Sequence, residues 1–380
     1  MPWRECNAMS LREEFAVLAG MEESNVRELC RRFGISPRTG YKWLGRWHDA
    51  GRAGLADRSR RPRSSPTRTP KQMERQVLAA RGAHPAWGGR KLRWMLLDQG
   101  YDRVPSASTI TAILRRHECL DREHPSSQGP WRRFTAPYPN ALWQMDFKGS
   151  VRLTSGGWCQ PLSLLDDCAR FCLTLDACAD QRTATVRSAL TGVFRRYGVP
   201  DRILVDNGSP WGSYAAHRYT PLRVWLIEQG VEMTHSRPYH PQTHGKVERF
   251  HRTLEAELIG RHAFADLPEC RRLFERWRAT YNLDRPHEAL GMEPPATRYR
   301  PSQRAYCESV AQPEYLPGDI VRVVYRKGRI SLHGRDVHAT SKAFRGKRIA
   351  LRPTDSDGVY DVYYYHRRIA QIDLRDAVAT

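Results

Sequence analysis

The sequence predicts a multidomain α/β protein in which helical modules precede a mixed central region and a β-rich end. Helix-capping patterns recur in the first third of the chain, and apolar strand-like runs followed by an amphipathic helical stretch mark its centre. The last section contains IVRVVYRKGRISL, KRIALRPT and VYDVYYYHRRIAQIDL, which are rich in β-formers and separated by Gly and Asp turns. A chain of 380 residues also exceeds the usual size of one domain.

Residues 1–56 predict a helix-turn-helix domain. Asn25, with Glu28 three residues later, caps a helix that Gly34 closes. Ser36 then caps a second helix, PRTGYKWLGRWHDAG, in which one shared face is predicted for Tyr41, Leu44 and His48. Because the second helix of such a unit lies in the major groove, the candidate DNA contacts are Arg38, Thr39, Lys42 and Arg46. A plain helical hairpin is the alternative.

Residues 57–70, DRSRRPRSSPTRTP, have too few apolar side chains to pack and predict a basic linker. Its arginines, Arg61 among them, are candidate phosphate contacts. Residues 71–120 predict a second helix-turn-helix domain, in which Ser106 caps one helix and Lys91 is a candidate DNA contact. A second polar linker is predicted for residues 121–140.

Three acidic residues stand out in the centre of the chain, in WQMDFKG, ILVDNGSPWG and HPQTHGKVERFHRTL. Asp146 alternates with large apolar residues on a predicted strand, so it faces away from their packed layer. Asp206 follows an apolar strand at an Asp-Asn-Gly turn. Glu248 lies beside the apolar stripe of a predicted helix. Three such carboxylates can hold a divalent metal ion if the fold brings them together.

The stretch from about Ala141 to Ile259, within a predicted core domain of residues 141–262, resembles the catalytic core of retroviral-integrase-type transposases of bacterial insertion sequences. The resemblance rests chiefly on DNG and HPQTHGKVERFHRTL. It implies a ribonuclease H-like mixed-sheet fold with a DDE triad, in which the matching residues are Asp146, Asp206 and Glu248. It also implies Mg²⁺, with Mn²⁺ as a substitute, and two-metal phosphoryl transfer that cleaves the ends of the element and joins them to target DNA. Asp166 and Asp167 are expected to order a turn.

The chain departs from the pattern of these transposases in two ways. Glu248 follows Asp206 by 42 positions, more than the family's usual spacing, and the extra length falls in a loop and helix region where insertions are tolerated. The residue seven beyond Glu248 is Glu255, where many relatives carry a Lys that contacts DNA. The candidate substitutes for that Lys are Lys246, Arg249 and Arg252.

Two further regions follow the predicted core. Residues 263–312 predict a helical extension, and its pattern YN…RPH…L again resembles these transposases. The resemblance implies that Arg285 and His287 lie near the helix of Glu248. Packing is the favoured role of His287, and catalysis is the alternative. Residues 313–380 predict a small basic β-barrel whose Lys, Arg and Tyr side chains contact the DNA backbone or form a solvated face.

The composition indicates a polyanionic partner, because 62 Lys and Arg against 41 Asp and Glu give a net charge of +21. No apolar run is long enough to span a membrane, and nine cysteines without a CxxC pair are typical of reduced thiols. A cytoplasmic, nucleoid-associated bacterial protein without membrane contact or structural zinc is therefore expected. Its expected partners are terminal inverted repeats, target DNA and further copies of the chain in a homodimer or larger assembly.

Two other functions remain open from the sequence. One is a non-enzymatic DNA-binding regulator that kept the fold, although three intact acidic residues argue against it. The other is a structure-selective nuclease of the same fold class, which would also need carboxylates and Mg²⁺. The DNA-binding modules predicted on either side of the core favour transposition over simple hydrolysis.

Overall fold

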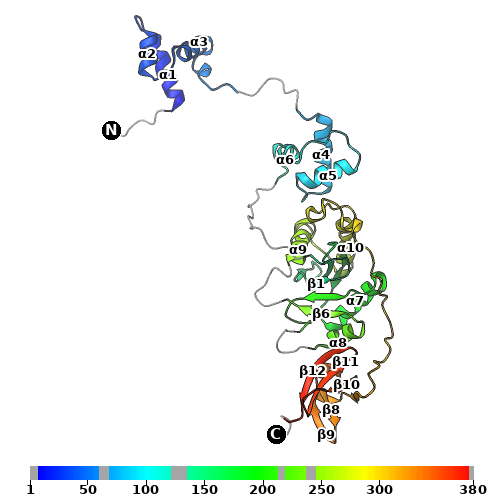
Figure 1. Cartoon of the computed structure of the whole chain (residues 1–380). Coiled ribbons are helices and arrows are strands. Elements are labelled where there is room, and N and C mark those ends of the chain that lie inside the picture. The colour runs from blue at the N-terminus through cyan, green and yellow to red at the C-terminus, as the bar shows by residue number, and fades with distance from the viewer. Residues whose placement is uncertain (1–6, 60–67, 121–134, 213–218, 237–244, 376–380) are drawn as a thin grey trace. The chain divides into compact units, whose positions relative to one another are not determined.

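The computed structural model describes residues 7–59, 68–120, 135–212, 219–236 and 245–375 (Figure 1). It divides the chain into two compact units, Met1–Arg68 and Thr69–Thr380. Within the described residues, no helix is long and apolar enough to cross a membrane.

The described residues of the first unit form three helices, α1 (Ala8–Ala19), α2 (Val26–Arg32) and α3 (Pro37–Gly54). Both predicted caps are confirmed. The side chain of Asn25 accepts hydrogen bonds from the backbone N–H groups of Arg27 and Glu28, and Ser36 accepts one from that of Thr39. α1 was not predicted, and it completes the unit by packing against the other two helices.

The predicted face of α3 is wrong. Trp43 is the buried aromatic of this helix, whereas Tyr41 is 55 % exposed. The reason lies at Gly40, because a Cβ atom there would lie 2.4 Å from Cys30 Sγ and 2.9 Å from Phe15 Cζ. Close approach at this glycine turns the face of Gly40 and Trp43 toward α1 and α2.

The second unit begins with another three-helix group, α4 (Lys71–Ala83), α5 (Gly89–Asp98) and α6 (Ala107–Arg116). Leu92 and Leu96 are buried in its core, and Ser106 accepts a hydrogen bond from the Thr109 N–H, as predicted.

The core sheet has six strands: β1 (Trp143–Phe147), β2 (Val151–Arg152), β3 (Trp158–Asp166), β4 (Cys172–Cys178), β5 (Arg202–Val205) and β6 (Glu232–His235). It is mixed, as predicted, because β3 is antiparallel to β1, β2 and β4, whereas β5 is parallel to β1 and β6. Trp143 and Met145 are fully buried in one core cluster, which confirms the alternation predicted for β1.

Helices cover both faces of this sheet. α7 (Thr183–Tyr197) and α8 (Pro221–Glu228) share a core with β1 and β5. α9 (Gly245–Glu257) and α10 (Leu267–Leu283) share another with β3 and β4. Short 3₁₀ turns lie at Ile259–Arg261, Glu288–Leu290, Pro295–Thr297, Arg326–Gly328 and Lys342–Phe344. The predicted helix of Glu248 is therefore present, with Phe250 and Leu254 in its buried stripe.

The interval between Asp206 and Glu248, expected to be a loop and helix region, contains the helix α8 among its described residues. Leu222, Trp225 and Leu226 pack into the core of the sheet. Val224 and Ile227 pack instead into the core of the C-terminal domain. With both sides buried, α8 connects two domains and is not a loose surface segment.

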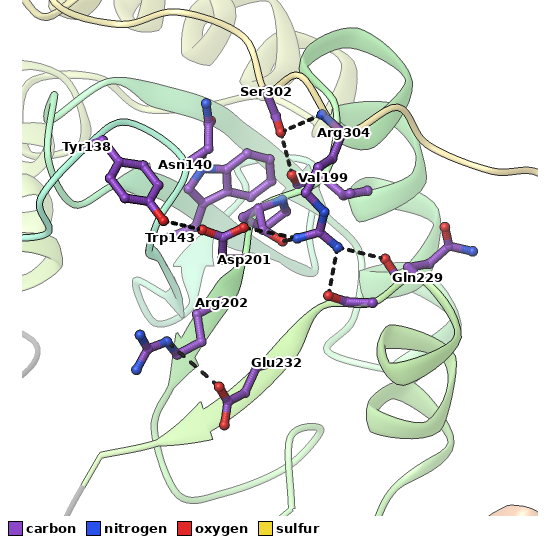
Figure 2. Close-up of polar contacts among 12 residues, drawn as sticks. Tyr138, Asn140, Trp143, Val199, Asp201, Arg202, Gln229, Glu232, Ser302 and Arg304 are labelled. Atoms are coloured by element: carbon purple, nitrogen blue, oxygen red, sulfur yellow. Dashed lines mark hydrogen bonds and ion pairs between the residues drawn. The ribbon is translucent and has the colours of Figure 1, made fainter. Parts of the chain in front are cut away.

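The segment after α10 runs beside the loop that precedes β5 (Figure 2). The guanidinium of Arg304 donates to the backbone carbonyls of Pro200 and Gly230 at 2.9 and 2.7 Å and to the carboxylate of Asp201 at 3.1 Å. The Arg304 carbonyl accepts from the Val199 N–H at 2.9 Å. Arg304 thereby ties together the two loops that lead into the parallel strands β5 and β6.

The C-terminal domain has a four-stranded antiparallel sheet of β7 (Ile320–Val323), β10 (Arg348–Pro353), β11 (Val359–Tyr364) and β12 (Arg367–Asp373). A separate hairpin, β8 (Arg329–Leu332) and β9 (Arg335–His338), shares its core. Glu228 of α8 accepts a hydrogen bond from Tyr364 and pairs with Lys347. The β-rich character predicted for residues 313–380 is thus present as an antiparallel sheet domain.

Replacing Gly40 by Ala is expected to destabilise α1–α3 by about 1–3 kcal/mol, because the new methyl group collides with Cys30 and Phe15. Gly45→Ala in the same helix is the matched control, since no atom lies within 4 Å of its added Cβ. That control should be neutral or gain up to about 1 kcal/mol. Native-state hydrogen exchange of the α1–α3 amides in the full chain measures both, and equal effects would refute the packing of α3.

Candidate active site

The fold brings Asp146 and Asp206 to neighbouring strands. β1 and β5 are parallel, with Gln144 opposite Leu204. Asp146 lies two residues beyond Gln144, and Asp206 lies two beyond Leu204 at the end of β5, so both emerge at the same level of the sheet. Glu248 lies in the first turn of α9, which contacts β1.

Asp146 lies within electrostatic reach of Asp206 and Glu248. Burial, followed by the charge of Asp206 and then by that of Glu248, raises the pKa of Asp146 from its ordinary value of 3.8 to about 7, although a hydrogen bond from the Phe147 N–H opposes the shift. Asp206 has a buried oxygen, Oδ1, without a hydrogen-bond partner. Both observations describe negative charge that the protein itself leaves uncompensated.

These residues fit a hard divalent cation by their chemistry. Carboxylate oxygens are the ligands that Mg²⁺ and Mn²⁺ prefer, and a cation would satisfy Asp206 Oδ1 and lower the pKa of Asp146. In the described ranges, no group of three or more His, Cys, Asp or Glu side chains is arranged to hold a metal ion. The three carboxylates would therefore have to move closer together to bind one.

A line of polar contacts joins α9 to β1, and we call it the β1–α9 seam. Alternation along the strand puts three polar residues of β1 and its extension on one face: Gln144, Asp146 and Lys148. The facing residues of α9 are Val247, His251 and Glu255, spaced four apart. Gln144 Oε1 accepts from the Val247 N–H at 3.3 Å. Asp146 Oδ2 lies 3.7 Å from His251 Nδ1, and Lys148 Nζ lies 3.0 Å from Glu255 Oε2.

His251 is a buried residue of the site that the sequence analysis missed. Its Nε2 lies 2.7 Å from Ser163 Oγ on β3, and this hydroxyl also donates to the backbone carbonyl of Asp146 at 3.1 Å. His251 and Ser163 therefore hold Asp146 from two sides. The available signal was the spacing of His251 within the apolar stripe of α9, between Phe250 and Leu254.

A buried ion pair fixes the start of α9. Asp167 is fully buried, and its carboxylate accepts from Gln144 Nε2 at 2.7 Å and from the Ala136 N–H at 2.6 Å. Lys246, at the second position of α9, forms an ion pair with the same carboxylate. Asp166 accepts from the Ala169 N–H at 2.6 Å, so the predicted ordering of a turn is confirmed.

The candidate DNA contacts of α3 differ in exposure. Arg38 and Lys42 are exposed, whereas Arg46 is half-buried with its guanidinium 4.9 Å from the centre of the Trp43 ring. Thr39 is half-buried, and its hydroxyl hydrogen-bonds Ser36 at 2.9 Å.

The remaining candidate DNA contacts are placed as follows. Arg249 and Arg252 are exposed on α9, and Arg61 lies outside the described residues. Lys91 is half-buried on α5, and burial lowers its pKa to about 8, with the charge of Arg285 as the next cause. Lys246 faces Asp167 in the protein interior, so its ammonium is already engaged.

Arg285 and His287 pack near the end of α9. Arg285 is buried and pairs with Glu257 of α9 at 3.0 Å. Burial lowers the pKa of His287 to about 3, and its ring lies edge-on to Tyr281. A neutral, packed imidazole agrees with the favoured structural role.

Family comparisons agree with this architecture. Residues 136–241 and 229–295 match models described as integrase core domain. Residues 319–380 match the C-terminal domain of IS481 family transposases. These matches make the chain similar to insertion-sequence transposases and to proteins with an integrase core. Homeodomain-like models match residues 10–56 and 39–114, which supports DNA as a partner.

Individual relatives are distant. The "Insertion element IS476 uncharacterized 39.2 kDa protein" of Xanthomonas euvesicatoria is 25 % identical over 260 residues, 66 % of this chain and 72 % of that protein. The "Insertion element IS407 uncharacterized 31.7 kDa protein" of Burkholderia multivorans is 27 % identical over 158 residues, 42 % of this chain. The match spans 54 %, about half, of the latter protein's length.

Solved structures show a similarly distant likeness. A chain of the simian T-cell lymphotropic virus intasome, in complex with PP2A regulatory subunit B56 gamma, is 16 % identical, with a TM-score of 0.37. That match covers 78 % of this chain and 99 % of the viral one. The catalytic core domain of BIV integrase is 21 % identical, with a TM-score of 0.31, over 42 % of this chain and 92 % of its own. Likenesses this distant say nothing about activity.

Replacing Lys246 by Met is expected to cost about 3–5 kcal/mol of unfolding free energy, because it leaves the buried Asp167 carboxylate without its cation. The double variant Lys246→Met/Asp167→Asn should lose less than the single one, because it removes the uncompensated charge. Arg182→Met, in an exposed pair with Asp180, is the control and should change stability by less than about 1 kcal/mol. Urea unfolding measures all three, and a harmless Lys246→Met would refute the buried pair.

In EDTA at pH 8, Asp146→Asn is expected to raise the thermal midpoint. With a folded pKa of about 7 against an ordinary 3.8, Asp146 contributes stability that is complete below 3.8 and lost as the pH rises through 7. The difference in thermal midpoint between the variant and the wild type should therefore grow as the pH rises from 3.8 to about 7. Each kcal/mol of unfolding free energy corresponds to about 2–4 °C. Mg²⁺ should raise the wild-type midpoint more than that of the variant. The exposed Asp355→Asn is the control, and a lower midpoint for Asp146→Asn at pH 8 would contradict the assignment.

Proposed function

We propose that the protein is a DNA transposase that cleaves phosphodiester bonds at the ends of an insertion sequence and joins the freed 3′-hydroxyls to target DNA. Asp146, Asp206 and Glu248 are its proposed catalytic residues. The observation that carries the proposal is the placement of these three carboxylates: Asp146 and Asp206 lie at the same level of two adjacent parallel strands, and Glu248 lies in the first turn of α9, which contacts β1.

The same three residues would hold two divalent cations, Mg²⁺ or its substitute Mn²⁺. When bound there, the cations would activate the attacking oxygen and stabilise the leaving one. The protein's own part is positional. Ser163 and His251 hold Asp146, and the Asp167–Lys246 pair fixes the start of the helix that carries Glu248.

We assign the other domains to DNA binding. Residues 1–56 and 71–120 would grip segments of a terminal inverted repeat, with Arg38, Lys42 and Lys91 among the contacts. Residues 313–380 would bind the DNA backbone. Because transposition requires two element ends to be brought together, we propose that a homodimer or larger assembly acts on the DNA of the bacterial nucleoid.

The proposal predicts that Asp146→Asn, Asp206→Asn and Glu248→Gln each reduce joining at least about 10³-fold and leave DNA affinity within about threefold, since catalytic charge stabilisation and DNA grip are separate. The assay incubates full-length protein with Mg²⁺, a target plasmid and labelled DNA taken from the flanks of the coding region, and scores joined products.

Asp355→Asn, an exposed carboxylate of the C-terminal domain, is the control and should join normally. Full joining by any of the three site variants would sink the assignment. Wild-type hydrolysis without joining would favour a nuclease, and binding alone would favour a regulator.

A further inference from the structure

The ion pair between Lys148 and Glu255 continues the β1–α9 seam beyond the proposed carboxylates. Lys148 lies two residues past Asp146, and its N–H still pairs with the Pro161 carbonyl of β3 at 2.9 Å. Alternation therefore keeps Lys148 on the face of Asp146. Glu255 lies seven residues, or two helical turns, past Glu248 on the same side of α9. The pair is thus adjacent to the site on both elements.

Without bound metal ions, the charges of this surface oppose the approach of DNA, and a basic side chain beside them reduces that opposition. A phosphate near the site faces the carboxylates of Asp146, Asp206 and Glu248, and Glu255 adds a fourth negative charge. Of the three candidate substitutes for the family's Lys, Lys246 is engaged inside the protein by Asp167. Lys148 is held beside Asp146 by strand pairing at its backbone and by Glu255 at its ammonium.

The pair is also accessible. The side chains of Lys148 and Glu255 are 24 % and 48 % exposed. A Lys ammonium has three N–H donors, so Lys148 can bind a DNA phosphate while one donor stays with the Glu255 carboxylate.

We propose that Lys148 binds the DNA phosphate next to the reacting bond and that Glu255 positions its ammonium for this contact. The inference rests on the proposed DNA-joining function. Here the strand supplies the cation and the helix supplies the acid. The pair therefore acts as one unit whose two charges can be exchanged.

Binding is tested separately from catalysis, in EDTA, with a mixed-sequence DNA duplex and the full-length protein. Lys148→Gln should weaken binding and lower the slope of log affinity against log salt by about 0.9, the effect of one lost phosphate contact. DNA should also slow acetylation of Lys148, read by mass spectrometry. Arg252→Gln, on the exposed face of α9, is the comparison. A slope change in Arg252→Gln but not in Lys148→Gln, with Lys148 acetylated equally with and without DNA, would overturn the proposal.

Exchanging the charges of Lys148 and Glu255 tests whether the two residues act as a pair. Lys148→Glu alone should reduce joining in Mg²⁺ by about tenfold or more, and Lys148→Glu/Glu255→Lys should recover most of that loss. Equal thermal midpoints show that both variants fold. A folded double variant no better than the single one refutes the pairing. If the wild type joins no DNA at all, the transposase proposal fails, while the EDTA experiments still decide whether Lys148 binds phosphate.

Discussion

The candidate site depends on how α9 docks along β1. Phe250 and Leu254 supply the apolar contact of the helix, and the polar seam fixes its register. Each residue turns a helix by about 100°, so a slip of one position would carry Glu248 away from Asp146. Apolar packing is non-directional and tolerates small shifts, whereas a hydrogen bond is lost within a fraction of an ångström. The polar contacts therefore determine where the third carboxylate lies.

Two pairs of aspartates near this sheet differ in how well the protein satisfies their carboxylates. Asp166 and Asp167 are fully buried, yet backbone N–H groups, Gln144 Nε2 and Lys246 surround their oxygens. Asp146 and Asp206 are less buried. Burial and the charges of Asp206 and Glu248 raise the pKa of Asp146, and Asp206 has a buried oxygen without a hydrogen-bond partner. Burial also raises the pKa of Asp166, so burial and a raised pKa do not by themselves mark a functional carboxylate. The oxygen of Asp206 without a partner is the stronger indication, because buried polar groups are usually hydrogen-bonded.

Local patterns in the sequence predicted the strands and the helix that carry the site. They did not predict contacts between distant residues or which face of a helix is buried. The strand end before Asp206 and the helix of Glu248 follow from apolar patterns within a few residues. The contact between His251 and Ser163 joins positions 88 residues apart, and no local pattern encodes it. The buried face of α3 was missed for a similar reason, because close approach at Gly40 overrides the apparent periodicity of Tyr41.

The helix α8, between Asp206 and Glu248, has an unusual composition that its packing explains. PLRVWLIE has no broad polar face, which is unusual for a helix on the surface of a sheet. The cause is that α8 is buried on both sides, by the sheet through Leu222 and by the C-terminal domain through Val224 and Ile227. In the chain, α8 follows Asp206 and precedes β6, which pairs with β5. The helix that follows Asp206 in the chain therefore packs both against the core sheet and against a domain proposed to bind DNA.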